Sequence, residues 1–264
     1  MFAIWDRLWP TAVECEVRDG TNPLNTAINH PAGKLAEVLV HLLRGRELTK
    51  EGGIEDDLQS RIEVILNEEQ EAARLSRVII ASRLALLHFS DPEWTEENVV
   101  PLFDWASSDE ARFAWSGYLW SPTMRPDLWP AMKPFFLATF DNVDQLRGEA
   151  QKSLAVLLAA ISVEGKQTLT SDEARDCLRQ LDEQGRTEVA RWIVRRLEGA
   201  DERAERLWAE RIGPWVESAW PQGAAFRSSA TSVSLAWAAI EAGNAFPEAV
   251  EVIESRVTAL DRPP

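Results

Sequence analysis

Apolar side chains recur along most of this chain with the spacing of a single helix face. In "GKLAEVLVHLLRGRE" (33–47) the apolar positions follow the pattern i, i+3, i+4, i+7 and i+8: Leu35, Val38, Leu39, Leu42 and Leu43. Residues at this spacing share one side of a helix, so that side must be buried against a neighbour. The same spacing returns over 54–66. Amphipathic helices that need partners are therefore the basic unit of the chain.

The rest of the chain extends this helical pattern. The segment Val78–Phe89, "VIIASRLALLHF", is apolar almost all round, which predicts a central helix covered on several sides. Only Val13–Val17 alternates like a strand, and five residues alone do not make a sheet. No fixed repeat is convincing. The sequence predicts an all-α protein, an irregular α-solenoid or multi-helical bundle of stacked antiparallel helical hairpins. Further helices are expected at 144–163, 171–183, 187–199, 201–219, 229–242 and 247–260.

Short polar signals mark where several helices begin and end. Ser107 with Glu110, and Thr170 with Glu173, fit the capping box, in which the two side chains satisfy otherwise unpaired N–H groups. The residue before a proline is pushed out of the helical region, so each Trp-Pro pair predicts a helix terminus. These pairs occur at 9–10, 129–130 and 220–221.

The stretch "FDWASSDEARFAWSGYLWSP" (103–122) gathers aromatic residues on a helix that starts near Asp109. Apolar residues fall on two of its faces, one with Trp115 and Tyr118 and the other with Gly117 and Trp120. Two apolar faces predict a helix sandwiched between neighbours, with Gly117 allowing a close approach. We interpret the aromatic residues as core. The alternative is an aromatic contact patch, because Trp and Tyr are enriched at the centres of protein interfaces.

Charge and composition restrict the partners and the compartment. Forty-three acidic against 28 basic residues give a net charge of −15, which repels a phosphate backbone and an anionic membrane surface. Neither nucleic acid nor a membrane is therefore an expected partner. Two cysteines fit a reducing compartment, and the most apolar segment, 153–163, is too short to span a bilayer. We expect a cytoplasmic protein.

One group of basic residues in the C-terminal half could form a local cationic face. Four arginines lie at 186, 191, 195 and 196, and acidic residues at 188, 198 and 201 are interleaved with them. This pattern favours a solvated face held by ion pairs over a nucleic-acid surface.

Tests for a phosphate loop and for a metal site fail. Gly33 and Lys34 resemble the end of a Walker motif, but Ile28 stands where its first glycine belongs and Leu35 follows the lysine. Glu37 and His41, four residues apart on one helix, are too few to hold a metal. No metal or cofactor is expected.

Signs of catalysis are equally scarce. There is no Gly-x-Ser-x-Gly elbow and no GxGxxG, and neither Cys15 nor Cys177 has a recognisable histidine context. We expect no catalytic residues. Arg83 is a lone charge in the apolar segment 78–89, and a buried guanidinium needs a partner. Asp104 and Glu110 are the candidates for that partner.

The polar run "NTAINHPAGK" (25–34) precedes the strongest amphipathic helix. Asn is well suited to cap a helix, so our preferred interpretation is that Asn29 or His30 caps this one. The alternative is recognition of a partner, with these side chains and Lys34 facing a groove shared with the aromatic helix. The candidate partner-binding residues are then Asn29, His30, Lys34, Trp115, Tyr118 and Trp120.

Three strings, at 24–43, 78–105 and 110–122, give the chain a resemblance to a known family: "LNTAINHPAGKLAEVLVHLL", "VIIASRLALLHFSDPEWTEENVVPLFDW" and "EARFAWSGYLWSP". The chain resembles the helical domain of unknown function found C-terminal to sirtuin-like domains in bacterial proteins associated with anti-phage defence. The resemblance implies that a sirtuin-like effector hydrolyses NAD while the helical region serves sensing, autoinhibition or assembly. The NAD loop, catalytic histidine setting and zinc cysteines of sirtuins are missing here, so we expect a fragment or a stand-alone relative without the effector.

The expected organisation follows from both lines of reasoning. Residues 1–21 are expected to form a helix and linker that continue an upstream array, and 22–264 a helical domain with a seam at 141–150. The expected function is a non-catalytic interaction or sensing module that binds a protein, either a phage component or the sirtuin-like effector domain. The alternatives are a structural homo-oligomerisation domain and a hydrolase with a carboxylate-lined helical cleft.

Overall fold

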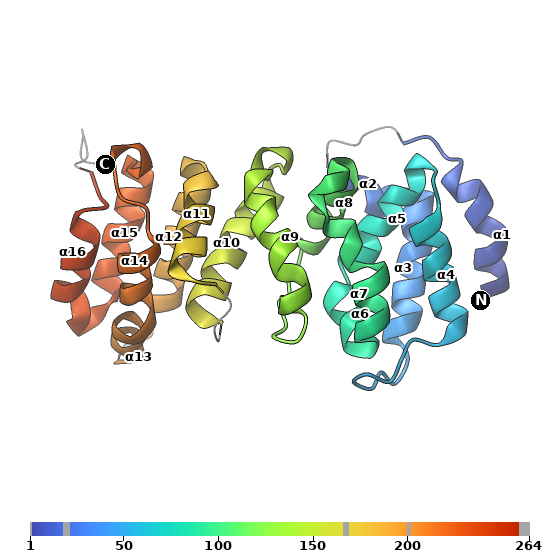
Figure 1. Cartoon of the computed structure of the whole chain (residues 1–264), viewed down its shortest axis with the longest axis horizontal. Coiled ribbons are helices and arrows are strands. Elements are labelled where there is room, and N and C mark those ends of the chain that lie inside the picture. Colours follow the sequence, from blue (N-terminus) through green and yellow to red (C-terminus); the bar gives the residue numbers. More distant parts are fainter. Residues whose placement is uncertain (1, 18–21, 166–168, 200–201, 259–264) are drawn as a thin grey trace. The chain divides into compact units, whose positions relative to one another are not determined.

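The chain is built from helices and loops. The structure is a computed structural model and describes residues 2–17, 22–165, 169–199 and 202–258. No strand occurs within these ranges, so the predicted all-α, multi-helical architecture is confirmed (Figure 1). The alternating stretch 13–17 begins at the last residue of a helix and forms no strand. The chain divides into two compact units, Met1–Ala150 and Gln151–Pro264.

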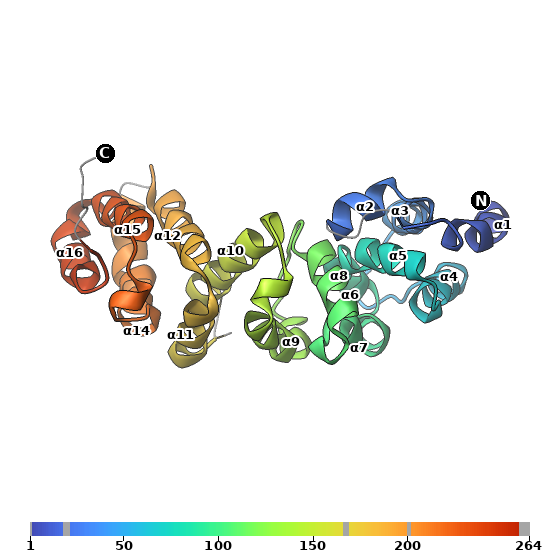
Figure 2. The ribbon, with the colours of Figure 1, turned by 90° about the horizontal axis from the view of Figure 1, so that it is seen from above.

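Unit 1 is a bundle of helices arranged around α5. Its elements are α1 (Phe2–Val13), α2 (Pro23–Asn29), α3 (Pro31–Arg44), α4 (Asp56–Asn67), α5 (Glu71–Ala81), α6 (Leu84–Ser90), α7 (Pro92–Asn98), η1 (Val100–Phe103), η2 (Trp105–Ser107), α8 (Ser108–Tyr118), α9 (Trp129–Asp141) and η3 (Val143–Gln145). Helix α5 packs against α1, α2, α3, α4 and α8, and Figure 2 shows it among α3, α4 and α8. Apart from Glu71 and Arg74, all of its residues are buried. The prediction of a central helix is thus confirmed for 78–81.

The predicted single helix over 78–89 is wrong, because the chain breaks between α5 and α6. The hydroxyl of Ser82 donates a hydrogen bond to the carbonyl of Ile79 (2.6 Å), and Arg83 leaves the helical region with φ −118° and ψ 15°. A serine side chain that bonds to its own backbone offers an alternative to the helical ladder. The break turns Arg83 into a corner residue between two helices.

The aromatic residues of 103–118 form the core between α8 and its neighbours. Phe103, Trp115 and Tyr118 pack edge to face, with ring centroids 5.0–5.8 Å apart. The indole N–H of Trp115 donates to the carbonyl of Phe103 (3.3 Å), so its polar atom is satisfied inside the core. The preferred interpretation of these rings as core is confirmed.

Gly117 lets α8 approach α5 closely, as predicted. A Cβ atom built at this position would lie 2.1 Å from the carbonyl oxygen of Val78. Two atoms cannot occupy that separation, so only glycine fits where the two backbones meet. Gly33 plays the same part between α3 and α2, because its Cβ would lie 2.0 Å from the oxygen of Ala27. The glycine of the rejected phosphate motif therefore has a packing role.

The partner of Glu110 is Arg77, and the predicted pair with Arg83 is wrong. Arg77 is buried on α5, and its Nε and Nη2 atoms reach the two carboxylate oxygens of Glu110 at 2.7 and 3.0 Å. Arg74 approaches the same carboxylate at 3.4 Å. Asp104 accepts a hydrogen bond from the N–H of Ala106 and starts η2. Neither candidate carboxylate is bound to Arg83 in the described part of the chain.

Unit 2 contains the remaining elements. They are α10 (Glu149–Glu164), α11 (Ser171–Gln180), α12 (Glu183–Leu197), α13 (Glu202–Leu207), η4 (Trp208–Ile212), α14 (Gly213–Ala219), η5 (Ala224–Phe226), α15 (Ser229–Glu241), η6 (Gly243–Ala245) and α16 (Phe246–Glu254), of which α10 begins in unit 1. Helix α15 packs against α12 and α16, and α14 packs against α11 and α16. The predicted helix over 201–219 contains a π-helical turn, η4, just before Pro214, where the N–H of Gly213 donates to the carbonyl of Trp208.

Two of the three Trp-Pro pairs mark helix termini. Trp129 opens α9 and Trp220 follows the last residue of α14, but Pro10 lies inside α1, so the prediction is wrong there. In α1 the indole rings of Trp5 and Trp9 stack with centroids 5.1 Å apart. Both rings, which precede the proline, are buried in unit 1, and so are Ala12 and Val13, which follow it, so α1 packs on the unit on both sides of Pro10.

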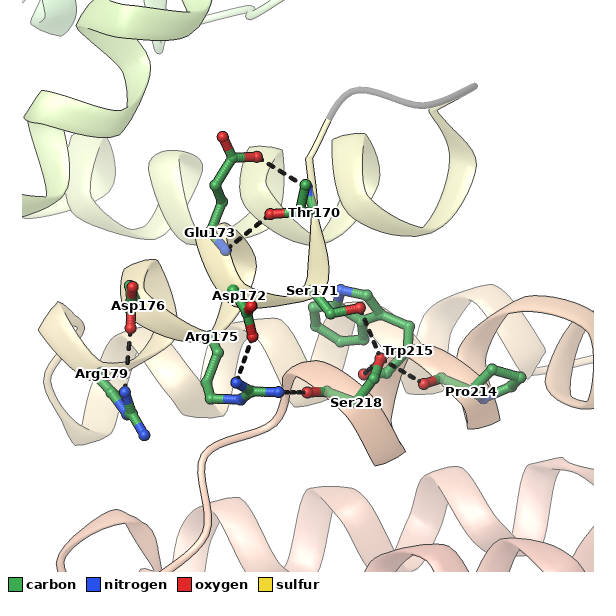
Figure 3. Close-up of polar contacts among 10 residues, drawn as sticks. All are labelled: Thr170, Ser171, Asp172, Glu173, Arg175, Asp176, Arg179, Pro214, Trp215 and Ser218. Atoms are coloured by element: carbon green, nitrogen blue, oxygen red, sulfur yellow. Dashed lines mark hydrogen bonds and ion pairs between the residues drawn. The ribbon is translucent and has the colours of Figure 1, made fainter.

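One of the two predicted capping boxes forms, at the start of α11. The N–H of Glu173 donates to the hydroxyl of Thr170 (3.2 Å), and the N–H of Thr170 donates to the carboxylate of Glu173 (2.8 Å; Figure 3). At α8 the side chain of Ser107 makes no cap bond, so this second box is wrong. The carboxylate that would complete it belongs to Glu110, which binds Arg77 instead.

The same end of α11 is tied to α14 by polar side chains (Figure 3). Ser171 donates to the hydroxyl of Ser218 (3.0 Å), which donates to the carbonyl of Pro214 (2.7 Å). Arg175 bridges Asp172 (2.6 Å) and the carbonyl of Ser218. These bonds tie together two helix ends of unit 2, and no imidazole takes part in them.

The capping box supplies a first prediction. Thr170→Ala removes the acceptor for the N–H of Glu173, and we expect it to lower the free energy of unfolding by about 1 kcal/mol. Ser107→Ala is the matched control, since Ser107 makes no cap bond, and we expect a change within about 0.5 kcal/mol. Urea denaturation followed by far-UV circular dichroism measures both. Equal losses from the two changes would contradict the assignment.

Candidate functional site

Unit 1 carries an open groove of about 670 Å³ between α2, α3, the end of α5 and the turn that follows α8. Its floor is apolar, with contributions from each of these helices: Leu24 and Ile28 of α2, Val38 and Val40 of α3, and Ile79 of α5. Trp120 lies at its edge and is 68% exposed, the largest exposed fraction among the large apolar side chains of the described residues. An exposed indole beside an apolar floor is typical of a binding surface.

The polar rim of the groove is mainly cationic. Lys34, Arg44 and Arg83 line it together with a single carboxylate, that of Glu37. Lys34 and Glu37 are an exposed ion pair with 2.9 Å between Nζ and Oε2. This excess of positive charge lies in a chain of net charge −15. The net charge of the groove lining is therefore positive, whereas the net charge of the whole protein is negative.

Arg83 and Arg44 are the cations of the rim that have no carboxylate bound to them among the described residues. The Nε atom of Arg83 is buried and has no hydrogen-bond partner in this part of the chain. Burial lowers the pKa of Arg83, the nearby charge of Arg44 lowers it further, and Glu37 acts in the opposite direction. Arg44 lies in the last turn of α3, where a cation also interacts favourably with the helix dipole.

Two of the six residues predicted for partner binding lie together on this groove. Lys34 and Trp120, 86 positions apart in sequence, both line it. The exposed Asn29 ends α2, and its side chain donates to the carbonyl of Asn25 (2.8 Å). His30 is buried, and its Nδ1 accepts from the N–H of Ala32 (3.2 Å), so it caps α3. The preferred interpretation of this segment as a helix cap is confirmed for His30.

The remaining two predicted residues are inside the protein. Trp115 and Tyr118 are 0% and 1% exposed, and neither lines the groove. Burial raises the pKa of the Tyr118 hydroxyl, which lies 3.9 Å from the sulfur of Met124. Within the aromatic segment Trp105 is half-buried, and Trp120 at its end is the exposed ring. The recognition hypothesis is therefore wrong for Trp115 and Tyr118, because both are core residues.

Arg44 was missed by sequence reasoning, and Arg83 was noticed for a different reason. The sequence showed Arg83 as a charge in an apolar segment, which is how such a corner residue appears before the break is known. Nothing in the sequence places Arg44 beside it, since they belong to helices that pack only in the folded unit. Glu37 and His41, the rejected metal pair, also lie on the groove.

A second surface lies on unit 2. Along α15 the side chains of Val233, Trp237 and Ile240 are 38%, 52% and 52% exposed, and Arg191 and Arg195 of α12 lie beside the first two. Arg191 pairs with Glu188 (2.8 Å), as predicted for an ion-paired face. The prediction of a solvated face is wrong for Arg186. This residue is buried, donates to the carbonyl of Leu181 and lies over the ring of Phe226. Asp201 lies outside the described residues.

Among the described residues, no group of three or more His, Cys, Asp or Glu side chains could hold a metal ion. None of the helices in the described ranges is both long and apolar enough to cross a membrane. Comparisons of the chain with protein-family models, with curated proteins and with solved structures found no match.

Proposed function

We propose that this chain is a non-catalytic helical interaction module that binds a protein segment in the groove of unit 1. The observation that carries the proposal is the groove itself, an apolar floor with the exposed ring of Trp120 at its edge. Exposure of a tryptophan ring to water is unfavourable, so a partner that covers the ring is stabilised in the complex. The partner is a protein, and the compartment is the bacterial cytoplasm.

The resemblance to helical regions that follow sirtuin-like domains supplies the biological setting. In that setting the partner is a phage component, which the module senses, or the NAD-hydrolysing effector, which it regulates. A binding role is also supported by the composition of the groove. Its described lining holds one carboxylate and one imidazole, Glu37 and His41, and the carboxylate is already paired with Lys34. The carboxylate-lined cleft of the hydrolase alternative gains no support from this lining.

A homo-oligomerisation domain is the second candidate, favoured by the exposed face of α15. Val233, Trp237 and Ile240 are spaced i, i+4 and i+7, so they form one apolar stripe on that helix. Sedimentation of the wild-type chain and of Trp237→Ala separates the candidates. A dimer that dissociates on this change supports self-association through α15.

The proposed function is tested by photo-crosslinking inside cells. Trp120 is replaced by the photoreactive residue p-benzoylphenylalanine, and Phe246, which is 45% exposed on unit 2, is replaced by the same residue as a control. We expect illumination of phage-infected cells, or of cells that carry the effector, to join the position-120 protein to one discrete protein partner. The control position should give no such product.

Binding of that partner should then depend on the groove. Trp120→Ala is expected to weaken binding by about 30-fold, which corresponds to a loss of about 2 kcal/mol at an interface hot spot. Isothermal titration with the purified partner measures this, and Phe246→Ala, at an exposed ring of unit 2, should leave the dissociation constant unchanged. Crosslinks that are equal at both positions, or absent from both, would show that the groove is not the binding surface.

A further inference from the structure

The cationic rim of the groove specifies more than an apolar ligand. Of the four charged side chains that line it, Lys34 and Glu37 bind each other. Their charges cancel, and Arg44 and Arg83 remain. Neither of these two arginines has an ion pair with a described residue, although the chain has 43 acidic residues that could have supplied one. Two unneutralised guanidinium groups on one groove leave it with excess positive charge.

Arg83 is held in this position at a cost. Its Nε atom is buried without a hydrogen-bond partner among the described residues, and a buried donor left unpaired costs free energy. Arg44 is near enough to act on it as a like charge. A guanidinium stays protonated across the physiological range, so the repulsion cannot be removed by losing a proton. An anion bound to both guanidinium groups from the groove would offset this repulsion.

The guanidinium groups of Arg83 and Arg44 are carried by different elements of the fold. Arg83 lies at the break between α5 and α6, where the bond from Ser82 to Ile79 sets the backbone. Arg44 ends α3, which also carries Lys34 at the other end of the groove. Ten residues of helix separate these two positions, which is about 15 Å. An extended peptide of about five residues has that length.

We propose that Arg44 and Arg83 form a carboxylate-binding subsite, and that the groove takes an extended acidic peptide whose apolar side chains cover Trp120 and the apolar floor. The inference rests on the proposed function, since it names the chemistry of the segment that the same groove binds. A planar guanidinium offers paired N–H donors that match the two oxygens of a carboxylate. The carboxylate comes from an Asp or Glu side chain or from the C-terminus of the partner.

The test uses a synthetic random heptapeptide library, acetylated at the N-terminus and prepared with either an amidated or a free C-terminus. We expect the wild-type chain to enrich peptides in which a carboxylate neighbours an aromatic or aliphatic residue. Enrichment of amidated Asp or Glu peptides assigns the subsite to a side chain, and enrichment confined to free C-termini assigns it to a terminal carboxylate. The best peptide is then measured by fluorescence anisotropy.

Matched variants identify the subsite. Arg44→Gln/Arg83→Gln should weaken binding of the best peptide on the order of 30-fold, because each loses its charged hydrogen bonds. A neutral version of the peptide, with Gln in place of Glu or with an amidated terminus, should bind weakly to wild type. The double variant should bind this neutral peptide with the same weak affinity. Raising the salt concentration should weaken wild-type binding and leave the double variant almost unaffected. Arg44→Gln alone, at an exposed position, keeps the test valid if the change at Arg83 lowers the melting temperature.

The possible failures are distinguishable. If enriched peptides carry no acid, lose affinity with Trp120→Ala and ignore Arg44→Gln/Arg83→Gln, the carboxylate subsite is wrong and the peptide-binding groove stands. If no peptide is enriched, or if enriched peptides ignore Trp120→Ala, the proposed function of the groove fails together with its subsite.

Discussion

Gly117→Ala is expected to lower the free energy of unfolding by about 3 kcal/mol, at the upper end of the cost of overpacking a core. The added Cβ would lie 2.1 Å from the oxygen of Val78 and 2.9 Å from its carbonyl carbon. Both are backbone atoms, so no side-chain rotation relieves the contact, and α8 must move away from α5. Alanine gains about 1 kcal/mol of helix propensity over glycine, which is too little to offset this.

Urea denaturation and thermal melting of the two proteins measure the effect. Gly45→Ala is the matched control, because a Cβ there would meet its nearest neighbour, the oxygen of His41, at 3.5 Å, an ordinary contact. Its backbone is also right-handed, with φ −75°, so we expect Gly45→Ala to be neutral or slightly stabilising. If Gly117→Ala were as mild as Gly45→Ala, α5 and α8 would not be in backbone contact.

Local features of the fold were readable from the sequence where a short segment decides its own structure. The periodicity of 33–47 predicted α3, and the polar pair Thr170 and Glu173 predicted a cap that the structure contains. Gly117 was predicted to allow a close approach because it interrupts an otherwise apolar helix face. For α3 and the cap, the residues that decide the outcome are neighbours in sequence; for Gly117 the sequence showed the small residue but not Val78, the residue that it approaches.

The errors arose where a polar side chain has a hydrogen-bond partner that apolar periodicity does not reveal. Glu110 was assigned to a cap with Ser107, or to Arg83, but the buried guanidinium of Arg77 takes both of its oxygens. Helix α5 ends before Ser82, whose hydroxyl donates to the carbonyl of Ile79, and apolar periodicity does not reveal this bond. Contacts across 33 positions, such as Arg77 to Glu110, depend on packing that one sequence does not specify.

The candidate site was predicted only in part, for the same reason. Lys34 and Trp120 were proposed to share a groove, and they do, because α3 and the end of α8 both border α5. His30 instead uses its ring to cap α3, and Trp115 and Tyr118 fill the core. Arg44 gave no signal, because an arginine in the last turn of a helix is common on electrostatic grounds alone.

The pair between Arg77 and Glu110 should be the most important ionic interaction in unit 1. Arg77 is 7% exposed, and its remaining Nη1 atom donates to the carbonyls of Ile65 and Glu68 at 3.1 and 2.9 Å. One side chain thus ties α5 to α8 and to the C-terminal end of α4. Removing Glu110 leaves a buried cation without its anion, and this situation costs far more than the loss of an exposed pair.

Glu110→Ala is therefore expected to lower the free energy of unfolding by about 3–5 kcal/mol, as is typical when one member of a buried pair is removed. Asp176→Ala is the control: it breaks the pair with Arg179, whose side chains are 72% and 51% exposed, and it should cost less than about 1 kcal/mol. Arg77→Met/Glu110→Leu should recover part of the loss, since no charge stays buried. The recovery should be incomplete, because the carbonyls of Ile65 and Glu68 lose their donor. A loss from Glu110→Ala no larger than that from Asp176→Ala would show that solvent, and not Glu110, balances the charge of Arg77.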